Sequence, residues 1–269
     1  MNYRHAFHAG NFGDCTKHAV LVWLLRALAR KPAGFCVLDT HAGRGRYSLY
    51  HGPAARTGEA RTGILRIRDD PAPELADYLA VVRACGLYPG SPAIAEHLLR
   101  PVDRLVCCEL HPEDFAALKR NFSTLAELHH RDAYEALGAL LPPRERRGLV
   151  LIDPPYEAAD ELACLADGLR RGHDRFPEGV FAAWYPIKHR APIRAFHAAM
   201  AASDIRDIVA AELWLRDPLD PTRLNGCGLL VVNPPYRFEQ EIPPLLAALL
   251  AGFAGEDGAG ASVTRIAPE

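Results

Sequence analysis

The stretch RGLVLIDPPYEAADEL (residues 147–162) is matched later in the chain by GCGLLVVNPPYRFEQEI (residues 226–242). Each is an apolar run of strand length that ends in an acid or an amide followed by Pro-Pro-Tyr. Because proline has no amide hydrogen to donate to a neighbouring strand, each run is expected to end as a strand at its prolines. Which copy lies where a ligand can bind depends on the direction of its strand in the sheet.

The segments around the first copy alternate between helix and strand patterns. A helix is expected over Asp14 to Ala29, where apolar residues recur at helical spacing. Short apolar runs follow, separated by helix-like segments: FCVLDTH (35–41), DRLVCCEL (103–110), AELHHRD (126–132), RGLVLIDPP (147–155) and GVFAAWYP (179–186). Strands that alternate with helices are typical of a parallel, doubly wound sheet, so the sequence predicts an α/β fold of the Rossmann-like kind.

The second copy belongs to a different arrangement. DIVAAELWL (207–215) and GCGLLVVNPPY (226–236) are joined by a polar loop, which predicts an antiparallel hairpin, and PPLLAALLAGFA (243–254) is expected as the last helix. Ligands bind at the carboxyl ends of the parallel strands in such a sheet. Asp153 is therefore the catalytic candidate. Asn233 is expected to end a strand at the opposite edge, with Tyr236 packed for structural reasons.

Composition narrows the class of protein. The chain has 269 residues, of which 49% are hydrophobic, and a net charge of −2, which is typical of a soluble globular protein and not of a strongly basic nucleic-acid binder. No signal-peptide pattern opens the sequence, and no apolar run reaches the roughly 18 residues of a membrane span, so a cytoplasmic protein is expected. The seven cysteines include no Cys-x-x-Cys pair, so they are interpreted as reduced core residues, and no metal site is expected.

The first strand ends in a candidate cofactor loop, in which Asp39 is followed by Gly43 and Gly45. The third glycine of the dinucleotide-binding pattern is absent, because Ser48 stands in its place. The order Asp-x-x-x-Gly-x-Gly is similar instead to methyltransferases that use S-adenosylmethionine (SAM), a cofactor without phosphates. A tight turn between strand and helix remains the alternative for this loop.

The second strand ends at Glu109, an acid placed to accept hydrogen bonds from two ribose hydroxyls. In a compact nucleotide-binding fold this acid follows the glycine loop by about 20 residues, whereas Glu109 follows Gly45 by 64. The excess predicts a helical insertion at residues 56–100, within a domain formed by residues 1–55 and 101–269. Alternatively, Glu109 serves only as the cap of the helix that follows it.

Two further polar residues stand at element ends. Ser91, which Pro92 follows, is expected to be the N-cap of the last helix of the insertion. Asp132 follows the third strand and offers an acid to which the amino group of an adenine could hydrogen-bond. For Asp132, a place in an ordinary surface loop is the alternative.

The tip Asp153-Pro154-Pro155-Tyr156 has the composition needed to methylate an exocyclic amine. The amine of adenine is a poor nucleophile, because its lone pair is delocalised into the ring. A carboxylate, and a backbone carbonyl held by proline, can accept hydrogen bonds from both N–H groups and turn the nitrogen toward a methyl donor. An aromatic side chain can stack on the base. Asp153, Pro154 and Tyr156 are therefore the predicted catalytic residues, and either Asp153 or water takes the departing proton.

Several segments of the chain resemble one bacterial family. They are YRHAFHAGNFGDCTKHAVL (3–21), LDTHAGRGRYSL (38–49), RTGEA (56–60), YPGSP (88–92), LIDPPYE (151–157), WYPIKHR (184–190) and TRIAPE (264–269). They are similar to the RlmJ-type methyltransferases, which act on N6 of one adenine in 23S ribosomal RNA. The resemblance implies a class I methyltransferase fold with a small helical insertion, SAM as donor, S-adenosylhomocysteine as product, and naked or early-assembly 23S rRNA as acceptor.

The resemblance also implies roles for single residues. SAM contacts are expected at Lys17, His18, His41, Gly43, Ser91, Glu109, Asp132, Ala133 and Asp153. Ala133 stands where the family commonly has glycine, which puts the backbone contact to adenine in doubt there. An RNA contact is implied at Tyr3, and the basic and aromatic segment around it adds Arg4, His5 and Asn11 as RNA-binding candidates. Arg44 and Arg46 beside the glycine loop are further candidates for a basic RNA-binding face.

The predicted protein is thus a cytoplasmic, monomeric RNA adenine-N6 methyltransferase that needs SAM, no metal and no membrane. A DNA adenine-N6 or cytosine-N4 methyltransferase is the alternative among enzymes, because such enzymes have the same Pro-Pro-aromatic tip. A non-catalytic RNA assembly factor that binds SAM for stability is the alternative from another class. The complete tetrad that begins at Asp153 argues against that last alternative.

Overall fold

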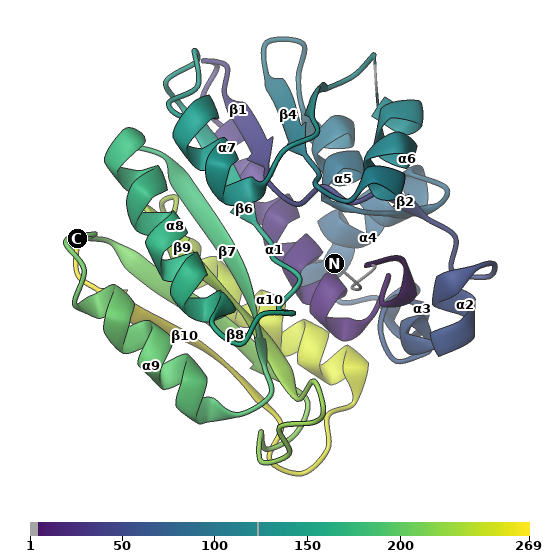
Figure 1. The fold of residues 1–269 in the computed structure, drawn as a ribbon. Coiled ribbons are helices and arrows are strands. Elements are labelled where there is room, and N and C mark those ends of the chain that lie inside the picture. The colour runs from purple at the N-terminus through teal and green to yellow at the C-terminus, as the bar shows by residue number, and fades with distance from the viewer. Residues whose placement is uncertain (1–4, 123) are drawn as a thin grey trace.

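The computed structural model describes residues 5–122 and 124–269. The chain forms an eight-stranded sheet with helices on both faces, in the order β10-β8-β9-β7-β6-β1-β4-β5 (Figure 1). The strands are β1 (Cys36–Asp39), β4 (Arg104–Cys108), β5 (Glu127–His129), β6 (Gly148–Ile152), β7 (Val180–Ile187), β8 (Ile208–Trp214), β9 (Gly226–Val232) and β10 (Gly260–Ala267). A separate two-stranded sheet pairs β2 (Arg46–Tyr47) with β3 (Tyr88–Pro89).

Five neighbouring strands, β5, β4, β1, β6 and β7, run parallel, which confirms the predicted doubly wound sheet. β9 is antiparallel to both β7 and β8, so the predicted C-terminal hairpin is also confirmed. β10 was not predicted and pairs antiparallel with β8 at the edge of the sheet. The central strands β1, β4 and β6 are buried on both faces, and this burial explains why their sequences are continuous apolar runs.

The helices form two layers. One side of the sheet carries α1 (Phe12–Ala29), α4 (Ala76–Ala84), α5 (Ser91–Leu98) and α10 (Phe238–Phe253) (Figure 1). The other side carries α7 (Ala133–Leu140), α8 (Glu161–Arg175) and α9 (Arg190–Ala201). The remaining helices include α6 (Pro112–Phe122), which follows β4. They also include five short ones: η1 (His5–Phe7), α2 (Pro53–Thr57), η2 (Glu59–Arg61), α3 (Ile64–Ile67) and η3 (Pro73–Leu75). No helix among the described residues combines the length and apolar character needed to cross a bilayer.

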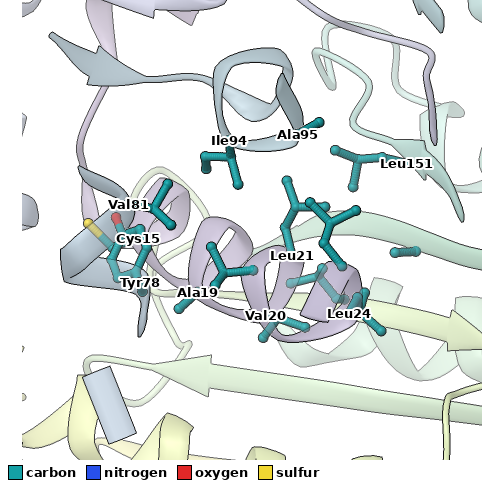
Figure 2. Packing of buried hydrophobic residues seen from close by; sticks show 14 of the residues in the cluster. Cys15, Ala19, Val20, Leu21, Leu24, Tyr78, Val81, Ile94, Ala95 and Leu151 are labelled. Carbon is teal, nitrogen blue, oxygen red and sulfur yellow. The ribbon is translucent and has the colours of Figure 1, made fainter. Parts of the chain in front are cut away.

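α1 is buried between the sheet and the helices of the 56–100 segment. Figure 2 shows Leu21 of α1 on the side of the helix that faces Ala95 of α5 and Leu151 of β6, and Leu24 belongs to the same buried cluster. Burying a leucine side chain of this kind contributes about 1.5–3 kcal/mol. The helix begins at Phe12, two residues before the predicted start, because the Asn11 side chain accepts a hydrogen bond from the amide of Asp14 and serves as N-cap. Since α1 is enclosed, the polar residues on it are buried as well.

The two Pro-Pro-Tyr tips lie at opposite ends of the strands, because β9 is antiparallel to the parallel strands, as predicted. Val232 at the end of β9 pairs with Phe181 near the start of β7. Asn233 Nδ2 donates hydrogen bonds to the carbonyl oxygens of Pro177 and Gly179, at 2.7 and 2.8 Å, on the chain that enters β7. The expectation that Tyr236 packs was wrong, because its side chain is 85% exposed.

The cysteines and the 56–100 segment complete the fold. All seven cysteines are free, and five are buried, whereas Cys85 and Cys164 are partly exposed. The segment from 56 to 100 runs from the end of α2 past the end of α5, and α5 contacts β1 and β4. The division of the chain into a domain and an insertion at 56–100 stays a prediction.

Candidate active site

A cavity of about 340 Å³ lies at the carboxyl ends of β1, β4, β5 and β6. This volume is within the range of small-molecule sites. The cavity brings together ten of the residues predicted from sequence: Lys17, His18, His41, Gly43, Ser91, Glu109, Asp132, Ala133, Asp153 and Pro154. Lys17 and His18 come from α1 and Ser91 comes from α5. The others follow the ends of four strands, because the carboxyl ends of parallel strands meet at one edge of the sheet.

The end of the cavity that contains the predicted catalytic residue Asp153 has an ion-pair cluster built on α1. Lys17 Nζ lies 2.5 Å from Asp153 Oδ2 and 3.1 Å from Asp14 Oδ1. The Lys17 and Asp14 side chains are each only 4% exposed, and that of Asp153 is 14% exposed. Burial opposes the charge of Lys17, but the two carboxylates outweigh it and raise the pKa of this amine. Lys17 therefore stays protonated and holds one oxygen of Asp153. The hydrogen bonds that described residues form with Asp153 involve Oδ2 and the main-chain amide, and none involves Oδ1.

His41 fixes the backbone of Asp153 from the other side. The Asp153 amide donates to His41 Nδ1 at 3.2 Å. Burial lowers the pKa of His41 to about 4, so the ring is neutral at physiological pH. The same Nδ1 lies 2.9 Å from Thr40 Oγ1, so Thr40 also holds the ring. Asp153 is thus held both by its side chain and by its main chain.

The rest of the Pro-Pro-Tyr tip is also fixed. Pro154 and Pro155 line the cavity, and Tyr156 has a left-handed backbone with φ of 54°, which is uncommon for a bulky residue. The Tyr156 hydroxyl donates to the carbonyl oxygen of Trp184 at 2.5 Å, and the two rings meet edge to face with centroids 5.7 Å apart. Tyr156 lies beside the cavity and is not among its lining residues. Its stacking role stays a prediction.

Glu109 lines another part of the cavity, after the end of β4. Its Oε2 accepts a hydrogen bond from the Gly43 amide at 2.8 Å, and its Oε1 accepts one from the His111 amide at 2.6 Å, just before α6 begins. Burial raises the pKa of Glu109. The carboxylate therefore orders the glycine loop and the start of α6 together. Its role as a ribose acceptor stays a prediction.

Ser91 and Asp132 occupy helix starts, but not as expected for Ser91. The N-cap of α5 is Gly90, and Ser91 is the first helical residue, so the N-cap prediction for Ser91 was wrong. Asp132 is the N-cap of α7, where its Oδ1 accepts from the amides of Tyr134 and Glu135 at 2.9 and 3.1 Å. Both residues still line the cavity. The two capping hydrogen bonds of Asp132 Oδ1 limit what that oxygen can offer a ligand.

Some residues of the cavity were missed from sequence. Tyr134 of α7 and Glu161 of α8 both line it, and the Tyr134 hydroxyl donates to Glu161 Oε1 at 2.9 Å. They are 27 residues apart and belong to no local motif, so only the fold brings them together. Cys164, one turn further along α8, also lines the cavity. Among the described residues, no group of three or more His, Cys, Asp or Glu side chains is arranged to hold a metal ion.

The two arginines expected to form a basic face beside the glycine loop are both paired with carboxylates. Arg44 pairs with Asp114 and Arg46 pairs with Glu96, each with a closest nitrogen–oxygen distance of 2.5 Å. The Arg46 guanidinium also lies 5.2 Å from the centre of the Phe122 ring. Both arginines are therefore occupied by protein partners.

The N-terminal RNA-binding candidates are only partly described. Tyr3 and Arg4 lie outside the described residues, and of His5 only the backbone in η1 is described. Asn11 uses both ends of its amide within the protein, since Oδ1 caps α1 and Nδ2 donates to Glu59 Oε2 at 3.0 Å. An RNA contact at these four residues stays a prediction.

Comparison with known proteins places the chain in a family. The family model described as "Ribosomal RNA large subunit methyltransferase D, RlmJ" matches residues 32–265. A protein of Escherichia coli K12 named "Ribosomal RNA large subunit methyltransferase J" is 39% identical, and the protein of the same name from Haemophilus influenzae is 37% identical, each over the full length of both chains. A crystal structure of a Legionella pneumophila protein, 34% identical, superposes with a TM-score of 0.87 over 96% of this chain and 98% of that one. The chain therefore belongs to the RlmJ family of ribosomal RNA large subunit methyltransferases.

Proposed function

We propose that the protein transfers a methyl group from SAM to N6 of an adenosine in 23S ribosomal RNA. The observation that carries this proposal is the Asp153 carboxylate, which stands at the catalytic edge of the sheet with Oδ2 held by Lys17 and Oδ1 left to accept a hydrogen bond. Family membership supports it, because the two relatives above are named as ribosomal RNA large subunit methyltransferases.

The chemistry of the cavity fits SAM. Glu109, Asp132 and Ala133 all line the cavity. The Glu109 carboxylate would accept hydrogen bonds from the ribose hydroxyls, and Asp132 with the backbone of Ala133 would hold the adenine. A Cβ added at Gly43, where φ is 56°, would lie 2.4 Å from the Tyr47 hydroxyl, so a side chain there would crowd the loop. When bound, SAM supplies a methyl group on a positively charged sulfur.

The residues of this chain act on the substrate amine by positioning it. The target adenosine must leave its stack to reach the cavity. Asp153 Oδ1 and the main-chain carbonyl of Pro154 would accept hydrogen bonds from the two N–H groups, so that the nitrogen lone pair points toward the donor. Lys17 holds the carboxylate in this orientation, and the Tyr156 ring, which is fixed through its hydroxyl, would stack on the base.

The site of action follows from the same proposal. The protein would work in the cytoplasm as a monomer, on naked 23S rRNA or on an early assembly intermediate. N6 of adenine and N4 of cytosine in DNA are the competing acceptors, because the Pro-Pro-Tyr tip alone does not distinguish the sugar. A non-catalytic assembly factor is disfavoured by the buried Lys17–Asp153 ion pair, since a binding role for the protein does not require a charged pair at the catalytic edge.

Methyl incorporation tests the proposal. Purified protein and labelled SAM are incubated with one acceptor at a time. The acceptors are unmodified 23S rRNA, unmodified 16S rRNA and single-stranded DNA of the 23S sequence. We expect label in 23S rRNA only, recovered as N6-methyladenosine after nuclease digestion, and little label with Asp153→Ala. Label confined to the DNA would overturn the RNA assignment. Protein that is folded and binds SAM but labels none of the acceptors would favour the assembly factor.

A further inference from the structure

A basic and aromatic surface lies on the 49–68 segment, away from the cavity itself. It is formed by Tyr50, Arg56, Arg61 and Arg68, and we call it the insertion surface. Tyr50 is 64% exposed, although it is a large aromatic residue, and its hydroxyl accepts a hydrogen bond from Arg68 Nη1 at 3.0 Å. Arg56 and Arg61 are exposed, and their side chains have no ion pair or hydrogen bond with any described residue. Their charges are therefore available to a partner.

The N-terminal segment is fastened directly to this part of the chain. Thr57 Oγ1 donates to the carbonyl oxygen of Phe7 at 2.5 Å. The half-buried Glu59 carboxylate takes His8 Nδ1 on one oxygen, at 2.8 Å, and Asn11 Nδ2 on the other, at 3.0 Å. Figure 1 shows α2 and α3 beside the start of α1, next to the N-terminal end. The insertion surface and the N-terminal segment therefore form one continuous region.

A short relay of contacts joins this region to the catalytic end of the cavity. The amide of Gly10 donates to Asp14 Oδ2 at 2.9 Å, and Asp14 Oδ1 lies 3.1 Å from Lys17 Nζ. Lys17 in turn binds Asp153. Gly10 has φ of 81°, and a Cβ there would lie 2.8 Å from Ile64 of α3, so the segment fits closely against the 49–68 chain. The segment that carries the insertion surface is therefore connected, through Gly10 and Asp14, to the Lys17–Asp153 pair of the cavity.

We propose that the insertion surface binds the RNA strand that flanks the target adenosine, with Arg56 and Arg61 on phosphates and Tyr50 stacked on a neighbouring base. The inference rests on the proposed function, because it concerns the substrate of that same site. Arginines without a protein partner and an exposed aromatic ring on one segment are a composition that binds single-stranded RNA, since phosphates attract the charge and every base offers a face for stacking. Arg68, the arginine that contacts Tyr50, also pairs with Asp69 at 3.2 Å, so the phosphate contacts are assigned to Arg56 and Arg61. The arginines expected for this role from sequence, Arg44 and Arg46, are already paired with carboxylates.

The charge component is tested with the double variant Arg56→Ala/Arg61→Ala. The matched control is Arg146→Ala/Arg171→Ala, which removes two exposed arginines whose side chains also have no partner among the described residues. Arg146 precedes β6 and Arg171 lies in the second half of α8, so both are remote from the cavity entrance. RNA affinity is measured at several salt concentrations, together with kcat and KM for RNA and the dissociation constant of SAM.

We expect the Arg56/Arg61 variant to bind RNA about tenfold more weakly near 0.1 M salt, and its slope of log K against log salt to be shallower by about 1.4, the value for two phosphate contacts on a single strand. KM for RNA should rise by a similar factor, with kcat and SAM affinity unchanged, and the control should match the wild type. Equal behaviour of the two double variants would overturn the inference. If the wild-type protein methylated no RNA, the proposed function would fail instead, and the two failures are thus distinguishable.

The stacking component is tested at Tyr50. Tyr50→Phe removes only the hydroxyl that accepts from Arg68, whereas Tyr50→Ala removes the ring. We expect Tyr50→Ala to weaken RNA binding about tenfold at every salt concentration, because stacking releases no counterions, and Tyr50→Phe to remain within twofold of the wild type. Equal losses in both variants would assign the effect to the hydrogen bond and contradict the stacking role.

Discussion

Replacing Asp153 by alanine is expected to stop methyl transfer without removing the cofactor site. The change deletes the acceptor for the target amine, and loss of at least about 100-fold in rate corresponds to about 2.7 kcal/mol of transition-state stabilisation. Lys17 keeps its contact to Asp14, so the buried amine is not left without a counter-charge. Asp153→Asn keeps an acceptor oxygen but loses the charge that Lys17 binds, so its rate should fall between those of the wild type and Asp153→Ala.

Asn233→Ala is the matched variant, because Asn233 begins the second copy of the same Pro-Pro-Tyr motif. The substitution removes two hydrogen bonds, to the carbonyl oxygens of Pro177 and Gly179. At about 0.5–1.5 kcal/mol for each bond, the free energy of unfolding should fall by about 1–3 kcal/mol. These bonds lie at the edge of the sheet opposite the cavity, so the methylation rate per folded molecule should stay within twofold.

The two variants are compared in one assay. Initial rates are measured with labelled SAM and saturating RNA, and SAM affinity by calorimetry, while urea titrations give the folded fraction of each variant. Asp153→Ala should bind SAM within a few-fold of the wild type and turn over slowly. A folded Asn233→Ala protein without activity, beside an active Asp153→Ala protein, would reverse the assignment of the two copies and refute the argument from strand direction.

Three further outcomes are expected. Glu109→Ala should weaken SAM binding by roughly ten- to a hundredfold in calorimetry, because a charged hydrogen-bond acceptor is lost, and an unchanged affinity would leave this residue only its structural contacts. The pKa of His8 should lie above 6.5, because it donates a hydrogen bond to Glu59, and should fall in Glu59→Gln. The His8–Glu59 pair therefore stabilises the N-terminal segment fully below pH 6.5, and this stabilisation is lost as the pH rises through the raised pKa of His8. An NMR titration of His8 would measure that pKa. Gly45→Ala should lower the free energy of unfolding by about 2–4 kcal/mol in urea titration, because the glycine has φ of 74° and an added Cβ would lie 2.3 Å from a neighbouring phenylalanine ring; a neutral effect would show that the loop can relax.

The parts of the fold that sequence predicted are those where burial imposes a pattern. β1, β4 and β6 are covered on both faces and are therefore continuous apolar runs. Their carboxyl ends carry Asp39, Glu109 and Asp153, so the polar residues that follow each apolar run correctly predicted the edge of the sheet where the cavity lies. The hairpin of β8 and β9 was recognisable because a loop without a helix cannot connect parallel strands.

The parts that were missed depend on contacts between distant residues or on weak local patterns. β10 is an edge strand in which most side chains are partly exposed, so its sequence has no continuous apolar run. Arg44 and Arg46 looked like free positive charges because their partners, Asp114 and Glu96, are 70 and 50 residues away. Tyr236 was expected to pack because aromatic residues usually do, but its tip projects into solvent.

The strand order also determines when the protein can fold during its synthesis. β8 has hydrogen-bonded neighbours only in β9 and β10, and both follow it in the chain. The residues that line the cavity all lie between Lys17 and Cys164, so they are synthesised before β8. The five parallel strands can therefore assemble first, with β7 as an open edge until β9 emerges. A nascent chain would then possess a cofactor site before its sheet is complete, and SAM bound there would stabilise the unfinished domain against misfolding.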